Sequence, residues 1–268
     1  MKISSRSGLR PVNDTRLYYE TAGNGSTAVV LIHGMTLDTR MWSDQFAPLA
    51  EKHTVVRYDM RGFGRSKIPV EGQPYSHVDY LRALLEYLHI SSAALVGLSF
   101  GGGVALDFAL TYPHMTGSLV LADSVLGGWD WSPEWSDQAG RVWATGRREG
   151  ANAARRLWMR MPVFAPAFDQ PSVGARLKQM MSDYSGWHWT HDDPEICLDP
   201  PTAQRLKEIS LPVQIILGER DVSDFQTIAA TLTAGISGAA KFVIPEVGHM
   251  SNMEAPTAFN RAVLEFLG

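Results

Sequence analysis

The pentapeptide Gly97-Leu98-Ser99-Phe100-Gly101 has the spacing of a nucleophilic serine carried on a sharp turn. Small residues at positions 97 and 101 let a strand and the helix that follows it approach closely, while the turn holds the serine in a strained backbone conformation. The first amides of that helix point to the space above the serine, where they can stabilise a developing negative charge. The spacing therefore predicts a nucleophile and part of an oxyanion site in one loop.

The residues that flank Ser99 favour this interpretation over a chance match. The run 93–98 is short and apolar, which is typical of a strand buried on both faces. After the serine, apolar residues recur at helical spacing until Tyr112-Pro113 ends the pattern. We therefore expect a strand, a tight turn and a helix, with the serine at the turn.

Two further residues could activate the serine, because its hydroxyl needs a general base, and the base needs a carboxylate to orient it. Asp221 follows one predicted strand and His249 follows another, which gives the chain order Ser99, Asp221, His249. Loops converge at the carboxyl edge of an open parallel sheet, so we expect the three side chains to meet there. Asp123 also follows a strand and is the alternative acid; otherwise it caps a helix or holds a loop.

The elements that position these residues alternate along the chain, which favours a mostly parallel, doubly wound α/β sheet of eight strands. A turn at Asn13-Asp14 predicts that the first two strands form a hairpin. The predicted strands are 9–12, 15–21, 28–32, 54–58, 93–98, 118–122, 212–217 and 240–245. Besides the helix after Ser99, helices are predicted over 39–52, 76–88 and 255–267.

The segment 126–205 has a different composition and no strand pattern, and it holds seven of the eight tryptophans. It predicts a helical lid, called the cap below, inserted between core segments 1–125 and 206–268. Aromatic side chains are common in ligand pockets. We expect the substrate pocket over Ser99 to be lined by Trp129, Trp131, Trp135, Trp187 and Trp189. Trp143 and Trp158 are expected to pack the cap helices onto the core.

Other cap residues carry charge or can titrate. The cap histidines His188 and His191 could touch substrate, but solvated histidines are more common in loops, so we expect both to be solvated. The arginines form a basic face on which one member, if turned inward, would hold a substrate carboxylate; they are Arg147, Arg148, Arg155, Arg156 and Arg160.

The composition excludes several classes of function. The chain has 24 basic and 28 acidic residues, a net charge of −4, and no block of like charges, which argues against nucleic acid or an anionic membrane as partner. The single cysteine, Cys197, excludes an intramolecular disulfide and is expected to be a buried apolar side chain. With no apolar leader at the N-terminus, we expect a cytoplasmic protein.

No cluster of His, Cys, Asp or Glu has metal-ligand spacing, and the glycines at 97–103 do not form a phosphate-binding loop, so neither a metal nor a cofactor is predicted. The expected partner is a small molecule, and the sequence leaves self-association into a homo-oligomer open.

Five motifs in order resemble those of the α/β-hydrolase family over nearly the whole chain. They are His33-Gly34 after a strand, Asp59-x-Arg61-Gly62-x-Gly64-x-Ser66, the Ser99 turn, Gly218-x-x-Asp221, and Gly248-His249. The resemblance implies that Ser99 is the nucleophile, His249 the general base and then acid, and Asp221 the orienting carboxylate. It also implies that the backbone amides of Met35 and Phe100 form the oxyanion hole.

The resemblance also implies a reaction class. Epoxide and haloalkane hydrolases of this fold need a carboxylate at the turn, whereas Ser99 points to acyl transfer. The chain is most similar to the serine esterase, enol-lactonase and cofactor-free haloperoxidase branches. We therefore expect hydrolysis of a small carboxylic ester or lactone through an acyl-enzyme. The alternatives are a carbon-carbon bond hydrolase acting on a vinylogous diketone, and a ligand-sensing regulator on a hydrolase scaffold.

The remaining residues of these motifs are expected to be structural. His33 should bond loop backbone beneath the oxyanion amide, and Asp59 should pair with Arg61 inside their loop. Asp224 should cap the helix after Asp221. The remaining acids of these loops, Glu219 and Glu246, should lie on the surface.

Overall fold

The core is one eight-stranded sheet in the computed structural model, which describes residues 5–268. The strand order is β1-β2-β4-β3-β5-β6-β7-β8; β1 pairs antiparallel with β2 and β2 with β4, and all other pairs are parallel. All eight predicted strands are present, so the predicted fold class is confirmed. Their bounds are β1 (Ser5–Val12), β2 (Thr15–Ala22), β3 (Ala28–Ile32), β4 (Thr54–Tyr58), β5 (Ala93–Leu98), β6 (Thr116–Ala122), β7 (Val213–Gly218) and β8 (Ala240–Ile244).

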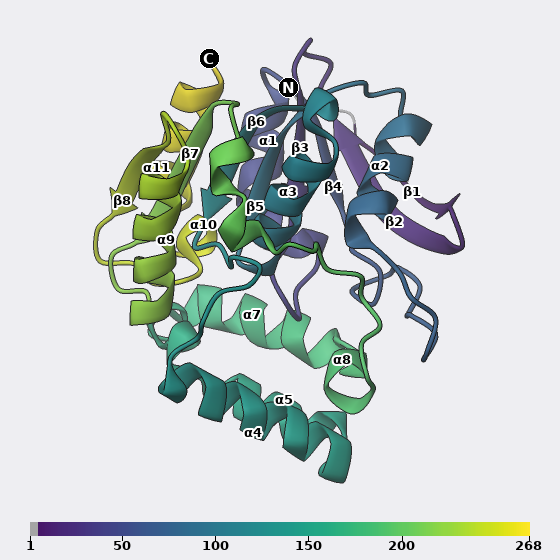
Figure 1. Ribbon diagram of the computed structural model, residues 1–268, viewed down its shortest axis with the longest axis vertical. Coiled ribbons are helices and arrows are strands. Elements are labelled where there is room, and N and C mark those ends of the chain that lie inside the picture. The colour runs from purple at the N-terminus through teal and green to yellow at the C-terminus, as the bar shows by residue number, and fades with distance from the viewer. Residues whose placement is uncertain (1–4) are drawn as a thin grey trace.

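Helices cover both faces of the sheet (Figure 1). Helix α1 (Ser43–Ala50) packs with α11 (Pro256–Leu267) on one face, and α2 (His77–Tyr87) packs with α3 (Phe100–Thr111) on the other. Because helices cover both faces, every residue of β3 and β5 is buried, which explains their continuous apolar sequences. No helix in the described part of the chain is both long and apolar enough to cross a membrane.

The helices differ from the sequence prediction in two places. The predicted helix over 39–52 begins as a 3-10 turn (Thr39–Trp42) capped by Asp38, and α1 follows it. Helices α9 (Ser223–Gly235) and α10 (Ser251–Glu254) were not predicted as ranges.

The cap is helical and lies beyond one end of the strands, at the bottom of the view in Figure 1. Its helices are α4 (Pro133–Glu149), α5 (Ala151–Trp158), α6 (Ala165–Phe168), α7 (Pro171–Asp183) and α8 (Trp187–Thr190). A short 3-10 turn (Pro162–Phe164) precedes α6, and the 3-10 turns Thr202–Gln204 and Leu206–Glu208 lead back to the core. The division of the chain at residues 125 and 205 remains our interpretation.

The expected ion pair between Asp59 and Arg61 is wrong. Asp59 accepts hydrogen bonds from the backbone N–H groups of Thr39 (2.7 Å) and Arg65 (2.8 Å), and therefore joins two loops. Arg61 instead points to the hairpin, where it pairs with Asp14 at 3.1 Å. Asp59 therefore holds the backbone of its loop, while the ion-pair partner of Arg61 is Asp14.

Two more expectations need correction. Cys197 is exposed rather than buried, because the segment that carries it runs along the surface after α8. Asp224 lies inside the first turn of α9 and does not cap it. Its carboxylate accepts hydrogen bonds from the backbone N–H (2.9 Å) and hydroxyl (2.7 Å) of Ser132, the residue that caps α4. Asp224 therefore connects the start of the first cap helix to the core.

Candidate active site

Ser99 lies at the tip of the turn between β5 and α3, with φ of 55° and ψ of −120°. A non-glycine residue at positive φ is strained, so the surrounding contacts must hold it there. A Cβ atom at Gly97 would clash with the Gly101 carbonyl, and one at Gly101 would clash with the Ile32 carbonyl. The two glycines are therefore required by the close approach of strand and helix.

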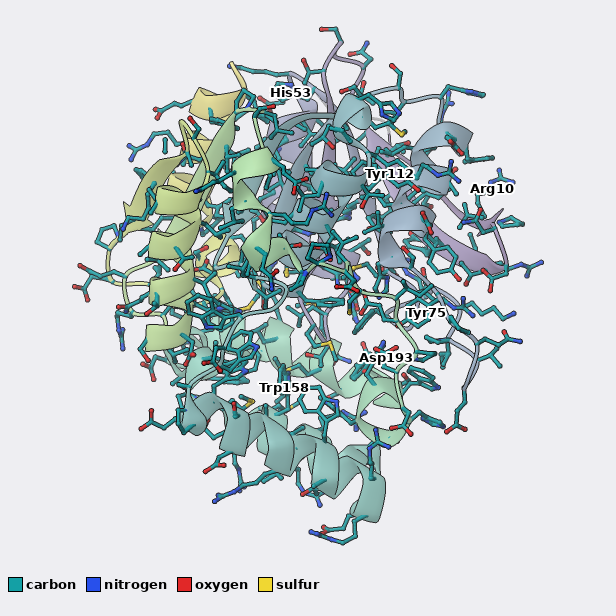
Figure 2. The ribbon with its side chains drawn as sticks, viewed as in Figure 1. Arg10, His53, Tyr75, Tyr112, Trp158 and Asp193 are labelled. Carbon is teal, nitrogen blue, oxygen red and sulfur yellow. The ribbon has the colours of Figure 1, made fainter. Side chains whose placement is uncertain are left out.

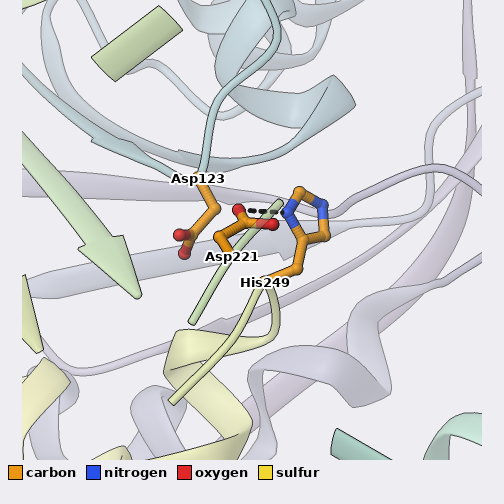
Figure 3. A group of neighbouring side chains, drawn as sticks. All are labelled: Asp123, Asp221 and His249. Carbon is orange, nitrogen blue, oxygen red and sulfur yellow. Dashed lines mark hydrogen bonds and ion pairs between the residues drawn. The ribbon is translucent and has the colours of Figure 1, made fainter. Parts of the chain in front are cut away.

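Asp221 and His249 meet as the sequence predicts. The Nδ1 atom of His249 lies 2.8 Å from Oδ2 of Asp221, and both side chains are buried (Figure 3). Since a carboxylate accepts the Nδ1 proton, Nε2 of the neutral imidazole keeps its lone pair. Ser99 and His249 line the same cavity, but in the described structure their side chains are not hydrogen-bonded to each other. The two side chains must come closer for proton transfer, as is common in unliganded sites.

Asp123, the alternative acid, lies on the far side of Asp221 from His249 (Figure 3). It accepts a hydrogen bond from the Gly218 backbone N–H at 2.8 Å and bonds the Ser251 hydroxyl. Burial and the neighbouring Asp221 carboxylate raise the pKa of Asp123 well above its usual range. Asp123 is thus suited to hold the loop after β7 as a neutral carboxylic acid, whereas Asp221 holds the histidine.

The carboxylate oxygens and Nδ1 atom of Asp123, Asp221 and His249 lie within 4.8 Å of one another, a grouping that could hold a metal ion. Their hydrogen bonds already engage these atoms: the second oxygen of Asp221 accepts from the Val222 N–H at 2.7 Å. The close grouping of these three side chains is thus explained by their hydrogen bonds within the protein.

The backbone N–H groups of Met35 and Phe100 have no hydrogen-bond acceptor among the described residues, as expected of donors kept for an oxyanion. His33 orients the first of them. Its Nε2 atom accepts from the Met60 N–H at 3.0 Å, so its Nδ1–H donates to the Gly34 carbonyl at 2.9 Å. In a trans peptide the N–H points opposite to the C=O, so this bond fixes the direction of the Met35 N–H. Burial lowers the pKa of His33 and keeps it neutral.

A cavity of about 260 Å³ opens over Ser99 and extends beneath the cap. Of the tryptophans expected to bind substrate, only Trp135 lines it. Trp143 and Trp158, expected to pack helices, line it as well, and the Trp158 indole N–H donates to the Thr36 hydroxyl at 3.0 Å. Trp158, the last residue of α5, lies on the side of that helix that faces the rest of the molecule (Figure 2).

The other four tryptophans of the set expected to bind substrate are not among the residues that line the cavity. Trp131 stacks on Trp135 with ring centres 4.9 Å apart, and Trp187 stacks on His191 at 5.1 Å. Trp189 is fully buried and Trp129 is half-buried. Which tryptophans reach the cavity depends on how the cap helices are rotated, and tryptophan content does not fix that rotation.

Most of the polar lining of the cavity was not predicted, because only His188 was considered as a substrate contact and then expected to be solvated. It includes His188, which is 3% exposed rather than solvated as expected, together with Asp193 and Glu195 from the segment after α8. None of the five cap arginines lines the cavity. Arg155 donates to the carbonyls of Met181 and Tyr184, and Arg147 pairs with Asp192; the remaining three are exposed.

Comparisons with known proteins agree with the fold. The family profile described as alpha/beta hydrolase fold matches residues 27–256, and the chain therefore belongs to this family. The chain is 28% identical over 261 residues to 3-oxoadipate enol-lactonase 2 of Acinetobacter baylyi, a match that covers 93% of this chain and 92% of the relative.

Two other similarities bear on function. The chain is 28% identical over 265 residues to a 2-hydroxy-6-oxononadienedioate/2-hydroxy-6-oxononatrienedioate hydrolase of Paraburkholderia xenovorans, covering 95% of this chain and 91% of the relative. Among solved structures, it is 27% identical to Est816, described as an N-acyl homoserine lactone degrading enzyme, with a TM-score of 0.78 and coverage of 97% and 100%. The names of the first and third of these proteins refer to lactones, whereas that of the second refers to an oxononadienedioate or oxononatrienedioate.

Proposed function

We propose that this protein is a serine hydrolase that cleaves a small carboxylic ester or lactone through an acyl-enzyme at Ser99. The observation that carries the proposal is the hydrogen-bonded Asp221–His249 pair, which lies beside a cavity shared by His249 and a strained serine. His249 Nε2 takes the Ser99 proton as Oγ attacks the carbonyl, and then gives that proton to the oxygen of the leaving alkoxide, which departs as the alcohol. Water next attacks the acyl carbon as the same histidine takes its proton, and the histidine returns that proton to Ser99 Oγ as the acid leaves.

The backbone N–H groups of Met35 and Phe100 stabilise the oxyanion that forms at each tetrahedral stage. They are held before substrate arrives, one by His33 and the other by the start of α3, so no reorganisation is needed during the reaction. The names of the enol-lactonase and of Est816 support a lactone or ester as substrate.

The experiment is hydrolysis of p-nitrophenyl acetate by the wild type and by Ser99→Ala. We expect the substitution to lower kcat by at least about 10³-fold, because it removes the nucleophile. Intact-protein mass spectrometry of an acid-quenched reaction should show an acetyl group on the wild type alone. Ser91→Ala is the matched control, since Ser91 is exposed and lies outside the cavity. Wild-type turnover by Ser99→Ala would overturn the proposal.

The similarity to a 2-hydroxy-6-oxononadienedioate hydrolase favours a second candidate, cleavage of a carbon-carbon bond in a vinylogous diketone. Loss of the chromophore of such a substrate, with little turnover of esters, would select it. A single turnover that leaves a lasting adduct on Ser99 would select a ligand-sensing role instead.

A further inference from the structure

One flank of the cavity ends in polar groups that the proposed reaction does not use. His188 lies in α8, and its ring stacks on Phe63 with centres 4.6 Å apart. Phe63 in turn lies 6.3 Å from Phe100, the residue after the nucleophile. His249 belongs to a different flank, against Phe225. The two histidines of the cavity are therefore held by separate sets of aromatic rings.

The proton of His188 can be assigned from its neighbours. The Tyr184 hydroxyl oxygen accepts the His188 backbone N–H at 3.1 Å and lies 2.6 Å from Nδ1. Nδ1 is the one acceptor that the described residues offer to the Tyr184 O–H, so Nδ1 accepts and the proton of the imidazole is on Nε2. Burial lowers the pKa of His188 to about 3, which keeps the ring neutral. Its Nε2–H is therefore an uncharged donor.

This Nε2–H has no hydrogen-bond partner among residues 5–268, although the side chain is almost fully buried. Its nearest carboxylate oxygen, Oδ2 of Asp193, is 3.8 Å away, which is too far for a hydrogen bond. A buried donor without an acceptor costs free energy, and a ligand oxygen in the cavity would remove that cost.

The titratable side chains that line the cavity beside His188 are those of two acids, Asp193 and Glu195. Asp193 accepts hydrogen bonds from the Tyr75 hydroxyl (2.8 Å) and the Glu195 N–H (3.3 Å) (Figure 2). Burial, together with Asp193 and Asp107, raises the pKa of Glu195 to about 8. No arginine or lysine of the described chain lines the cavity. At pH 7 a pKa of about 8 leaves Glu195 mostly protonated, so a ligand carboxylate placed here would gain no counter-charge and would face the Asp193 carboxylate.

We propose that the cavity selects esters or lactones with an uncharged acyl part whose carbonyl or ether oxygen accepts the His188 Nε2–H, and that Asp193, with no cation in the cavity lining to offset it, excludes acyl groups ending in a carboxylate. The inference rests on the proposed function, because it names the substrate class of the same site. It replaces the expectation that an inward arginine holds a substrate carboxylate. His188 is a specificity residue here and takes no part in proton transfer at Ser99.

The test compares three p-nitrophenyl esters of matched length: the 6-oxoheptanoate, the heptanoate and the hydrogen adipate, whose carboxylate replaces the terminal acetyl group. For the wild type at pH 7 we expect kcat/KM on the keto ester to exceed that on the heptanoate by about 3- to 10-fold, the effect of one neutral hydrogen bond. We expect it to exceed that on the adipate ester by at least about 30-fold, since a buried charge without a partner costs more.

Ratios of kcat/KM within each variant separate specificity from any loss of folded protein. His188→Phe keeps an aromatic ring against Phe63, and should bring the keto-to-heptanoate ratio to about one. His188→Gln keeps an N–H donor and should retain a ratio above one. Asp193→Asn should raise relative turnover of the adipate ester about tenfold because it removes the facing charge, whereas Glu195→Gln should change it little because Glu195 is mostly protonated at pH 7. His191→Phe is the matched control, since His191 lies outside the cavity and should leave both ratios as in the wild type.

The outcomes distinguish this inference from the proposed function. Turnover of the adipate ester equal to or above that of the keto ester would overturn the specificity while leaving ester hydrolysis in place. An unchanged keto-to-heptanoate ratio in His188→Phe would overturn the role of His188. Turnover of none of the three esters would overturn the proposed function and the inference together.

Discussion

Replacing Asp123 with asparagine separates the two buried acids next to His249. A neutral carboxylic acid and an amide have almost the same shape, and each offers an acceptor oxygen and a donor. The amide oxygen of the new side chain can still accept the Gly218 N–H, and its NH₂ group can donate to the Ser251 hydroxyl. We therefore expect Asp123→Asn to keep kcat within about threefold, whereas Asp221→Asn should lose about 10⁴-fold because it disturbs the histidine tautomer.

The same substitution should change how stability depends on pH. Asp123 has a raised pKa in the folded protein, so between the unfolded value of about 4 and that raised value the folded state binds one more proton than the unfolded state. The free energy of unfolding of the wild type therefore falls by about 1.4 kcal/mol per pH unit across this window on account of this group. Asparagine cannot titrate, so the variant escapes this loss.

Urea denaturation from pH 4 to pH 8 measures the effect. The stability difference, Asp123→Asn minus wild type, should be near zero at pH 4 and rise by about 1.4 kcal/mol per unit until the folded pKa is reached. Asp130→Asn, in an exposed aspartate of the cap, is the control and should show no such slope. A flat difference, or a hundredfold loss of kcat in Asp123→Asn, would refute the assignment of Asp123 as a neutral acid.

Two further substitutions test the supports of the site. Gly97→Ala places a methyl group against the Gly101 carbonyl, so the turn must shift; we expect about 1–3 kcal/mol of destabilisation by urea denaturation and at least a tenfold loss of esterase kcat. An unchanged urea midpoint would contradict the steric argument. Asp224→Ala removes two hydrogen bonds from Ser132 and should lower the free energy of unfolding by about 1–3 kcal/mol. Here the contradicting result is a stability equal to that of the wild type.

Local sequence signals were enough to predict the sheet and the turn at Ser99. Strands 28–32 and 93–98 are short apolar runs that end in glycine-containing turns, and their burial follows from composition alone. The hairpin turn could be predicted from the Asn13-Asp14 pair, because asparagine tolerates the positive φ that short hairpin turns require; Asn13 has a φ of 49°. The order of Asp221 and His249 after their strands was enough to predict that the two would meet.

The cap resisted prediction because its contacts join residues far apart in the chain. The indole of Trp158 reaches Thr36, and Asp224 reaches Ser132, through the docking of whole helices. Helical periodicity shows which residues share a face but not which face meets the cavity. Tyr184 lies in extended backbone after α7 and His188 lies in α8, so their contact depends on the turn at Ser185-Gly186, which helical spacing does not predict.

The position of β5 inside the sheet has a consequence for local opening. β5 lies between β3 and β6, all its residues are buried, and Ser99 follows directly on its last residue. Strands at the centre of a sheet open only with the whole protein, whereas surface helices and edge hairpins open at lower free energy. The cap and the first hairpin can therefore exchange their amide hydrogens with solvent many times while the nucleophile stays in place. Slow amide hydrogen exchange in β5 and fast exchange in α4 would show that the nucleophile stays in place while the cap opens locally.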